Sequence, residues 1–110
     1  MQVNTEIKDG VSLLRIEGEM TIYTAADLKA QLLPRLASPY ELEIDLSGVS
    51  ELDSAGVQLL MLAKREAGLG GRELRLSRHS PAVLEVFELC QLGGYFGDPL
   101  VFAGRGQGDA

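Results

Sequence analysis

The chain has 110 residues, of which 45% are hydrophobic and 24% are charged, and its formal net charge is −6. This length predicts one domain with a real core, and the composition argues against disorder outside the ends. Only ten Lys and Arg residues are scattered along an acidic chain. Nucleic-acid binding is therefore not expected, because contacts to phosphates need clustered cations.

The chain contains one cysteine, Cys90, and one histidine, His79. A lone cysteine forms no intramolecular disulfide, which suits a reducing compartment. Zinc sites usually recruit three or four His, Cys or carboxylate ligands, and no such spacing occurs, so neither a metal nor a cofactor is predicted. We expect His79 to lie on the surface between Arg78 and Ser80, and Cys90 to be a small core residue at the end of a helix.

The N-terminal segment 1–10 has neither the basic region nor the apolar region of a signal peptide. No apolar run approaches the roughly 20 residues needed to span a bilayer. These features predict a soluble cytoplasmic protein that does not insert into a membrane.

The first two elements read as a β-hairpin, with strands at 3–7 and 11–17. Asp9 and Gly10 lie between them, and this pair is typical of hairpin turns because glycine adopts a positive φ at little cost. The second strand changes phase at 13–14, which permits a bulge or burial on both faces. We expect Gly18 to end it.

A helix is expected from Thr24 to Leu36. Thr24 and Asp27 resemble a capping box, with Asp in place of the usual Glu or Gln. Pro34 lacks an N–H group, so the helix should kink or loosen near its end. The residues at helical spacing that should form its buried face are Ala25, Leu28, Leu32 and Leu36.

The segment 41–46 alternates strictly and predicts a half-buried strand. Leu42, Ile44 and Leu46 should face the core and the acidic residues the other side. The segment 47–53 is expected to be a loop, followed by a helix over 55–67 that glycines at 68–71 end.

A strand is expected over 72–77, with Leu74 and Leu76 inward, followed by a third helix. Ser80 is a good N-cap and Pro81 suits the first helical position, and the buried stripe should comprise Val83, Val86, Phe87 and Cys90.

A short edge strand is expected within 98–103, and residues 104–110 should form a flexible tail after a domain that spans residues 1–103. The element order predicts an α/β fold, a four- to five-stranded mixed sheet with about three helices.

The stretch 50–60, "SELDSAGVQLL", places an acid and a hydroxyl before an apolar helix, which raises the question of catalysis at Ser54. A serine nucleophile needs a nearby base, and His79 is the only histidine. The stretch does not match Gly-x-Ser-x-Gly, because Leu52 holds the first glycine position, and Val57 excludes Ser-x-x-Lys. The glycines at 68–71 lack the Gly-Lys-Ser/Thr ending of a phosphate-binding loop. An enzyme is not predicted.

Two interpretations of Ser54 remain, and they are compatible. Either Asp53 or Ser54 caps the helix by accepting a hydrogen bond from an unpaired backbone N–H group. Alternatively, Ser54 displays a hydroxyl at the positive end of the helix dipole, where a phosphate would be tolerated and would add negative charge to a docking surface.

The helix behind Ser54 is unusually apolar, since Gln58 is the only polar residue of 57–63. Val57, Leu60 and Met61 can face the sheet, which leaves Leu59 and Leu62 pointing elsewhere. Either neighbouring helices cover these two leucines, or they form apolar surface for a partner.

The segment "IDLSGVSELDSAGVQLLMLAKREAGLGGRELRLSRHSPAVLEVFELCQL", residues 44–92, resembles the STAS domain family, typified by bacterial anti-sigma factor antagonists. It carries a strand ending in Asp-Leu, Asp-Ser-x-Gly, a long helix, a glycine turn, a strand and a helix opened by Ser-Pro. The earlier "IEGEMTIYTAADL" is similar to the Gly-Glu-Leu-Asp strand and helix start of the family. The resemblance covers residues 3–102.

The resemblance implies that Ser54 is phosphorylated by an anti-sigma factor that is also a serine kinase. The unphosphorylated protein would bind this partner and free a sigma factor; the phosphorylated protein would release it, and a phosphatase would reset it. The expected partner-binding residues are Thr21, Tyr23, Asp53, Ser54, Ala55, Gly56 and Leu59.

Thr21 stands where the family pattern carries Asp. The resemblance also admits other partners, because stand-alone STAS proteins include a small subunit of a lipid-transporting ABC ATPase, with Thr at the position of Ser54. Others accompany chemotaxis-type signalling proteins. All of these bind a protein partner.

Overall fold

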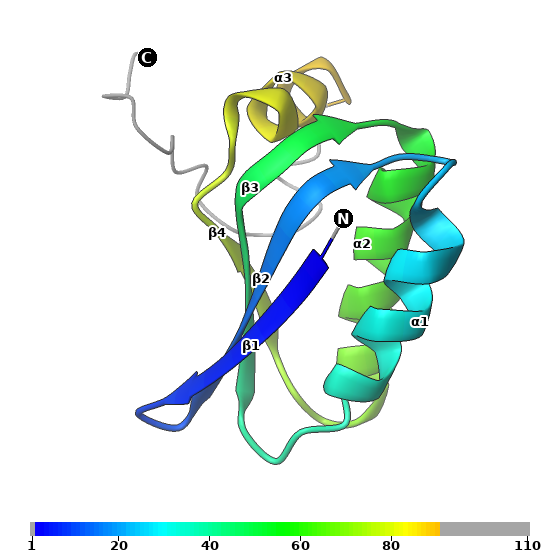
Figure 1. The fold of residues 1–110 in the computed structure, drawn as a ribbon. Coiled ribbons are helices and arrows are strands. Elements are labelled where there is room, and N and C mark those ends of the chain that lie inside the picture. The colour runs from blue at the N-terminus through cyan, green and yellow to red at the C-terminus, as the bar shows by residue number, and fades with distance from the viewer. Residues whose placement is uncertain (1, 91–110) are drawn as a thin grey trace.

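The structure is a computed structural model that describes residues 2–90. Within this range a four-stranded sheet has the order β1-β2-β3-β4, with β1 antiparallel to β2 and the other pairs parallel (Figure 1). The predicted α/β fold with a mixed sheet and three helices is confirmed. The expected strand within 98–103 and the tail lie outside the described residues. The elements are β1 (Gln2–Lys8), β2 (Val11–Met20), α1 (Ala25–Arg35), β3 (Glu41–Leu52), α2 (Ser54–Leu69), β4 (Leu74–Ser77) and α3 (Pro81–Cys90).

The N-terminal hairpin forms as predicted, with a two-residue turn between β1 and β2. Asp9 and Gly10 both have positive φ, 54° and 78°, as a turn matched to the strand twist requires. The expectation that Gly18 ends the second strand is wrong. Gly18 has φ 108°, and β2 continues to Met20 with irregular pairing to β3 on either side of this residue. An irregularity of this kind accommodates the positive φ of the glycine, and the hydrogen bonding between β2 and β3 continues beyond it.

Strand β3 is longer than predicted, because residues 47–52 are strand and not loop. They pair with the extended end of β2, as far as Met20 opposite Leu52. The inward leucines and isoleucine of 41–46 are fully buried, as expected. The expectation of a half-buried strand is wrong at Asp45, which is 2% exposed and forms ion pairs with Arg15 and Arg78.

Helices α1 and α2 lie side by side over one face of the sheet, and α3 lies across β3 from them (Figure 1). The core between sheet and helices includes the predicted Leu28 and Leu32 of α1 and Leu36 directly after its end, whereas Ala25 is only partly buried. The predicted capping box does not form. Thr24 makes no side-chain cap, and its hydroxyl donates instead to the backbone oxygen of Glu19 at 2.8 Å.

Helix α3 begins as predicted, since the Ser80 hydroxyl accepts a hydrogen bond from the Val83 N–H at 3.2 Å. Val83 and Phe87 are buried, but Val86 is only partly so, while Leu84 is buried. The side chain of Cys90 lies outside the described part of the chain.

The expected surface position of His79 is wrong. Its side chain has no exposed surface, and its ring meets Phe87 edge-on with 5.4 Å between centroids. None of the helices within residues 2–90 is long and apolar enough to span a membrane.

Candidate partner-binding site at the start of helix α2

Asp53, and not Ser54, is the N-cap residue of α2. Its Oδ1 accepts hydrogen bonds from the N–H groups of Ala55 at 2.9 Å and Gly56 at 3.1 Å. These are two of the donors that a helix start leaves unpaired. The cap is therefore a carboxylate, and it does not use the hydroxyl of Ser54.

The second oxygen of Asp53 joins two loops. Its Oδ2 accepts a hydrogen bond from the Ile22 N–H at 2.9 Å, across 31 positions of sequence. The Ile22 N–H, together with the N–H groups of Gly56 and Ala55, outweighs the opposing effect of burial and holds the pKa of Asp53 below its ordinary value. Asp53 is therefore ionised at neutral pH and ties the segment after β2 to the start of α2.

Gly56 permits the first turn of α2 to press against the end of β2. A Cβ at this position would overlap the Met20 carbonyl oxygen and lie 2.7 Å from the Leu52 Cδ1 atom. Any side chain would push the helix start away from the sheet. The glycine of the Asp-Ser-x-Gly pattern is thus required by packing.

Ser54 is the first residue of α2, and its side chain is exposed. Because Asp53 caps the helix, the Ser54 hydroxyl is not needed as a cap. It lies at the positive end of the helix dipole, beside the ionised carboxylate of Asp53.

The turn between β2 and α1 presents two large side chains beside this helix start. Ile22 is 70% exposed and Tyr23 is 91% exposed. Thr21 is nearly buried, and its hydroxyl accepts a hydrogen bond from the Tyr23 N–H at 3.3 Å. Thr21 therefore stabilises the turn from a nearly buried position, and of these two residues the side chain of Tyr23 is the one accessible to a partner.

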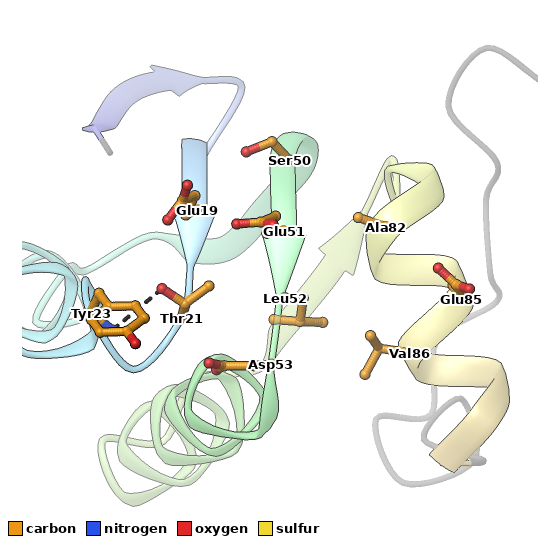
Figure 2. A pocket seen from close by; sticks show the side chains of 10 residues that line it. All are labelled: Glu19, Thr21, Tyr23, Ser50, Glu51, Leu52, Asp53, Ala82, Glu85 and Val86. Carbon is orange, nitrogen blue, oxygen red and sulfur yellow. Dashed lines mark hydrogen bonds between the residues drawn. The ribbon is translucent and has the colours of Figure 1, made fainter.

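An open hollow of about 630 Å³ adjoins these residues (Figure 2). It lies between the ends of β2 and β3 and helix α3, with Leu52 and Val86 among its apolar lining residues. Three exposed carboxylates, Glu19, Glu51 and Glu85, line it together with Asp53, so the hollow is acidic.

Leu59 lies elsewhere, on the side of α2 that faces α1. It is 5% exposed, and it lines a groove between the two helices with Ala25 and Lys29. Of the two interpretations of the apolar helix, cover by a neighbouring helix accounts for Leu59, whereas Leu62 is only partly buried. Leu59 thus has little surface to offer a partner.

A family model described as "Mlab, STAS domain" matches residues 3–101. The chain belongs to the STAS domain family. Among curated proteins it resembles the anti-sigma-B factor antagonist of Bacillus subtilis (strain 168), at 26% identity over 94 residues that cover 84% of this chain and 86% of that protein.

Solved structures of anti-sigma factor antagonists share this STAS fold. One from Mycobacterium paratuberculosis is 28% identical with a TM-score of 0.75, covering 90% of this chain and 83% of that one. The unphosphorylated form of SpoIIAA is 19% identical with a TM-score of 0.68, covering 94% and 90%. The phosphorylated form of SpoIIAA, from Bacillus, is 18% identical with a TM-score of 0.62, covering 94% and 93%. The two SpoIIAA comparisons bear on the fold alone.

The site of this STAS domain includes features that the sequence patterns missed. The contribution of Ile22 is a backbone N–H group, which residue type does not reveal. Glu51 and Glu85 come from segments 34 positions apart, and they line the same hollow because α3 lies beside β3. No group of three or more possible metal ligands occurs among residues 2–90.

Proposed function

We propose that this STAS domain is a regulatory binding protein of the anti-sigma factor antagonist type and not an enzyme. Phosphorylation of Ser54 would control its binding to a protein partner, a serine-kinase anti-sigma factor. The observation that carries the proposal is the exposed hydroxyl of Ser54 beside a helix cap that Asp53 already provides. A modification there alters the surface without removing a structural hydrogen bond.

A phosphate on Ser54 would carry about −1.5 to −2 charges at neutral pH. The N–H groups of the helix start would tolerate it, whereas Asp53 and the exposed Glu51 already make this surface negative. A partner fitted to the neutral hydroxyl would then meet added bulk, added charge and bound water. Burying this charge against a partner that has no cation to pair with it costs free energy, so the phosphate favours release.

The relatives support this proposal because of the class of protein to which they belong. The proteins with 26% and 28% identity over most of their lengths are anti-sigma factor antagonists. SpoIIAA, which has the same fold, occurs in phosphorylated and unphosphorylated forms. Tyr23 and the acidic hollow extend the proposed docking surface from Ser54 toward α3.

The first test compares partner binding by Ser54→Asp and Ser54→Ala. We expect Ser54→Ala to bind a candidate anti-sigma factor as the unmodified protein does, and Ser54→Asp to bind at least about tenfold more weakly. Isothermal titration calorimetry measures both. The matched control is Ser38→Asp, which adds the same charge beyond the far end of α1. Equal affinities for all three variants would contradict the proposed control at Ser54.

The second test asks whether Ser54 receives the phosphate. The protein is incubated with the candidate kinase and ATP, and its intact mass is measured. We expect one phosphate adduct, absent from Ser54→Ala and retained by Ser50→Ala, which alters the other exposed serine of the same stretch. An adduct that persists in Ser54→Ala would place the modification elsewhere.

A further inference from the structure

Strand β1 forms one edge of the sheet and has β2 as its only neighbour among the described strands. In Figure 1 it is the blue strand nearest the viewer. Its pairing with β2 is unbroken from Gln2 to Lys8, so no bulge bends this edge away. The strand also contains no proline. It therefore lacks two of the devices that commonly block pairing at an open edge.

The hairpin determines which backbone groups of β1 face outward. Lys8 and Val11 close a two-residue turn, and such a closing pair exchanges both of its hydrogen bonds. The hydrogen-bonded pairs then recur at every second residue, so the even-numbered residues of β1 direct their backbone groups toward β2. Val3, Thr5 and Ile7 direct theirs toward the open edge.

We propose that this edge pairs with the β1 strand of a second copy of the chain, antiparallel and centred on Thr5. In this register Thr5 lies opposite Thr5 of the second copy, and Val3 lies opposite its Ile7. Every outward-facing residue then meets another, which forms three hydrogen-bonded pairs. A shift by one residue would place outward groups opposite inward ones, and a shift by two would lose a pair.

The side chains fit this register. Ile7 is 56% exposed on the same face as Val3, which is buried at 5%. Self-pairing brings each Ile7 beside the Val3 of the second copy and removes apolar surface from water. Arg35 of α1 donates to the Thr5 hydroxyl at 2.9 Å, so helix α1 supports the centre of the strand.

The charges on β1 do not oppose its pairing with a second copy. On the other face of β1, Lys8 would lie opposite Gln2 of the second copy, and Glu6 opposite its Asn4. No two like charges are directly opposed, whereas direct opposition of like charges is destabilising. The two Glu6 side chains lie diagonally across the axis, where salt weakens their repulsion. The pairing would leave the start of α2 untouched, so it is independent of the function proposed above.

Sedimentation equilibrium tests the association at concentrations from about ten micromolar to about one millimolar. We expect a reversible dimer whose dissociation constant rises about tenfold or more in Thr5→Pro, because two hydrogen bonds are lost at the centre. The N–H of Thr5 points away from β2, so this variant should keep its fold, which circular dichroism verifies. The control is Thr5→Ala, which also removes the hydroxyl that Arg35 binds but keeps the Thr5 N–H, so its dissociation constant should stay close to that of the unmodified protein.

Cysteine cross-linking tests the register even if Thr5→Pro fails to fold. In a Cys90→Ser background, Thr5→Cys places one cysteine of each copy opposite the other. Their Cα atoms would lie about 5.5 Å apart, within the range of a disulfide. The control Ile7→Cys places them more than about 13 Å apart. We expect rapid oxidation to a disulfide dimer for Thr5→Cys alone. The proposal would be overturned if the protein sedimented as a monomer at every concentration, or if both cysteine variants cross-linked equally. Either result would leave this edge to a different strand.

Discussion

At the scale of single residues, Asp53 and Gly56 hold the start of α2 in place. Asp53 accepts from three backbone N–H groups on two segments, and Gly56 allows these segments to touch. Both residues stand in the pattern that the sequence singled out around Ser54. The sequence left open whether Asp53 or Ser54 forms the cap, because either side chain can accept such a bond.

A matched pair of glycine substitutions in α2 tests the packing role of Gly56. Replacing a helical glycine by alanine ordinarily stabilises a protein by up to about 1 kcal/mol. Gly68→Ala should do so, because a Cβ there meets nothing within 4 Å. Gly56→Ala should instead lower the free energy of unfolding by about 1–3 kcal/mol, because of its overlap with Met20 and Leu52. Urea denaturation measures both, and equal effects would refute the close approach.

At the scale of elements, local signals identified the turns and helix starts better than the strand ends. Asp9–Gly10 and Ser80–Pro81 act within a few residues, and both were predicted. The local residue pattern predicts a strand break at Gly18 and a loop over 47–52. They are strand because each supplies the other with a hydrogen-bonding neighbour, and neither segment alone contains that information.

The hairpin turn offers a prediction at this scale. Gly10 has φ 78°, and a Cβ there would meet nothing within 4 Å. Gly10→Ala should therefore lower the free energy of unfolding by about 1 kcal/mol through backbone conformation alone. Urea denaturation against the Gly68→Ala control measures this difference. A stabilisation equal to that of Gly68→Ala would contradict the assigned turn.

At the scale of the whole molecule, Asp45 joins segments that are far apart in the chain. Its carboxylate pairs with Arg15 of β2 at 3.3 Å and with Arg78 after β4 at 3.7 Å. Burial raises the pKa of Asp45, but hydrogen bonds from the Ser47 hydroxyl and N–H and from Arg15 outweigh it, so the pKa lies below its ordinary value. The charged form therefore stabilises the fold.

The pH dependence of stability tests this role. Because the folded pKa is lowered, the stabilisation is present above the ordinary value of 3.8 and is lost as pH falls through the folded value. Asp45→Asn should lower the free energy of unfolding by about 1–3 kcal/mol at neutral pH, and by progressively less as the solution is acidified below about pH 4. Urea denaturation across this range measures the difference.

Glu43→Gln is the control on the same strand. Its partner Arg75 lies 3.4 Å away in a partly exposed pair, so a change of at most about 1 kcal/mol is expected. A pH-independent deficit in Asp45→Asn would show that shape, and not charge, is what Asp45 contributes.

The sequence by itself determined the order of strands and helices, the hairpin, the Ser80 cap and the Asp-Ser-x-Gly pattern on which the site is centred. Each depends on spacing or on turn chemistry within a short stretch. Only the tertiary structure decided that His79 and Asp45 are buried, that Ile22 binds Asp53 and that α1 covers Leu59. These facts depend on which distant segments come into contact, because burial and long-range hydrogen bonds are properties of packing and not of local residue pattern.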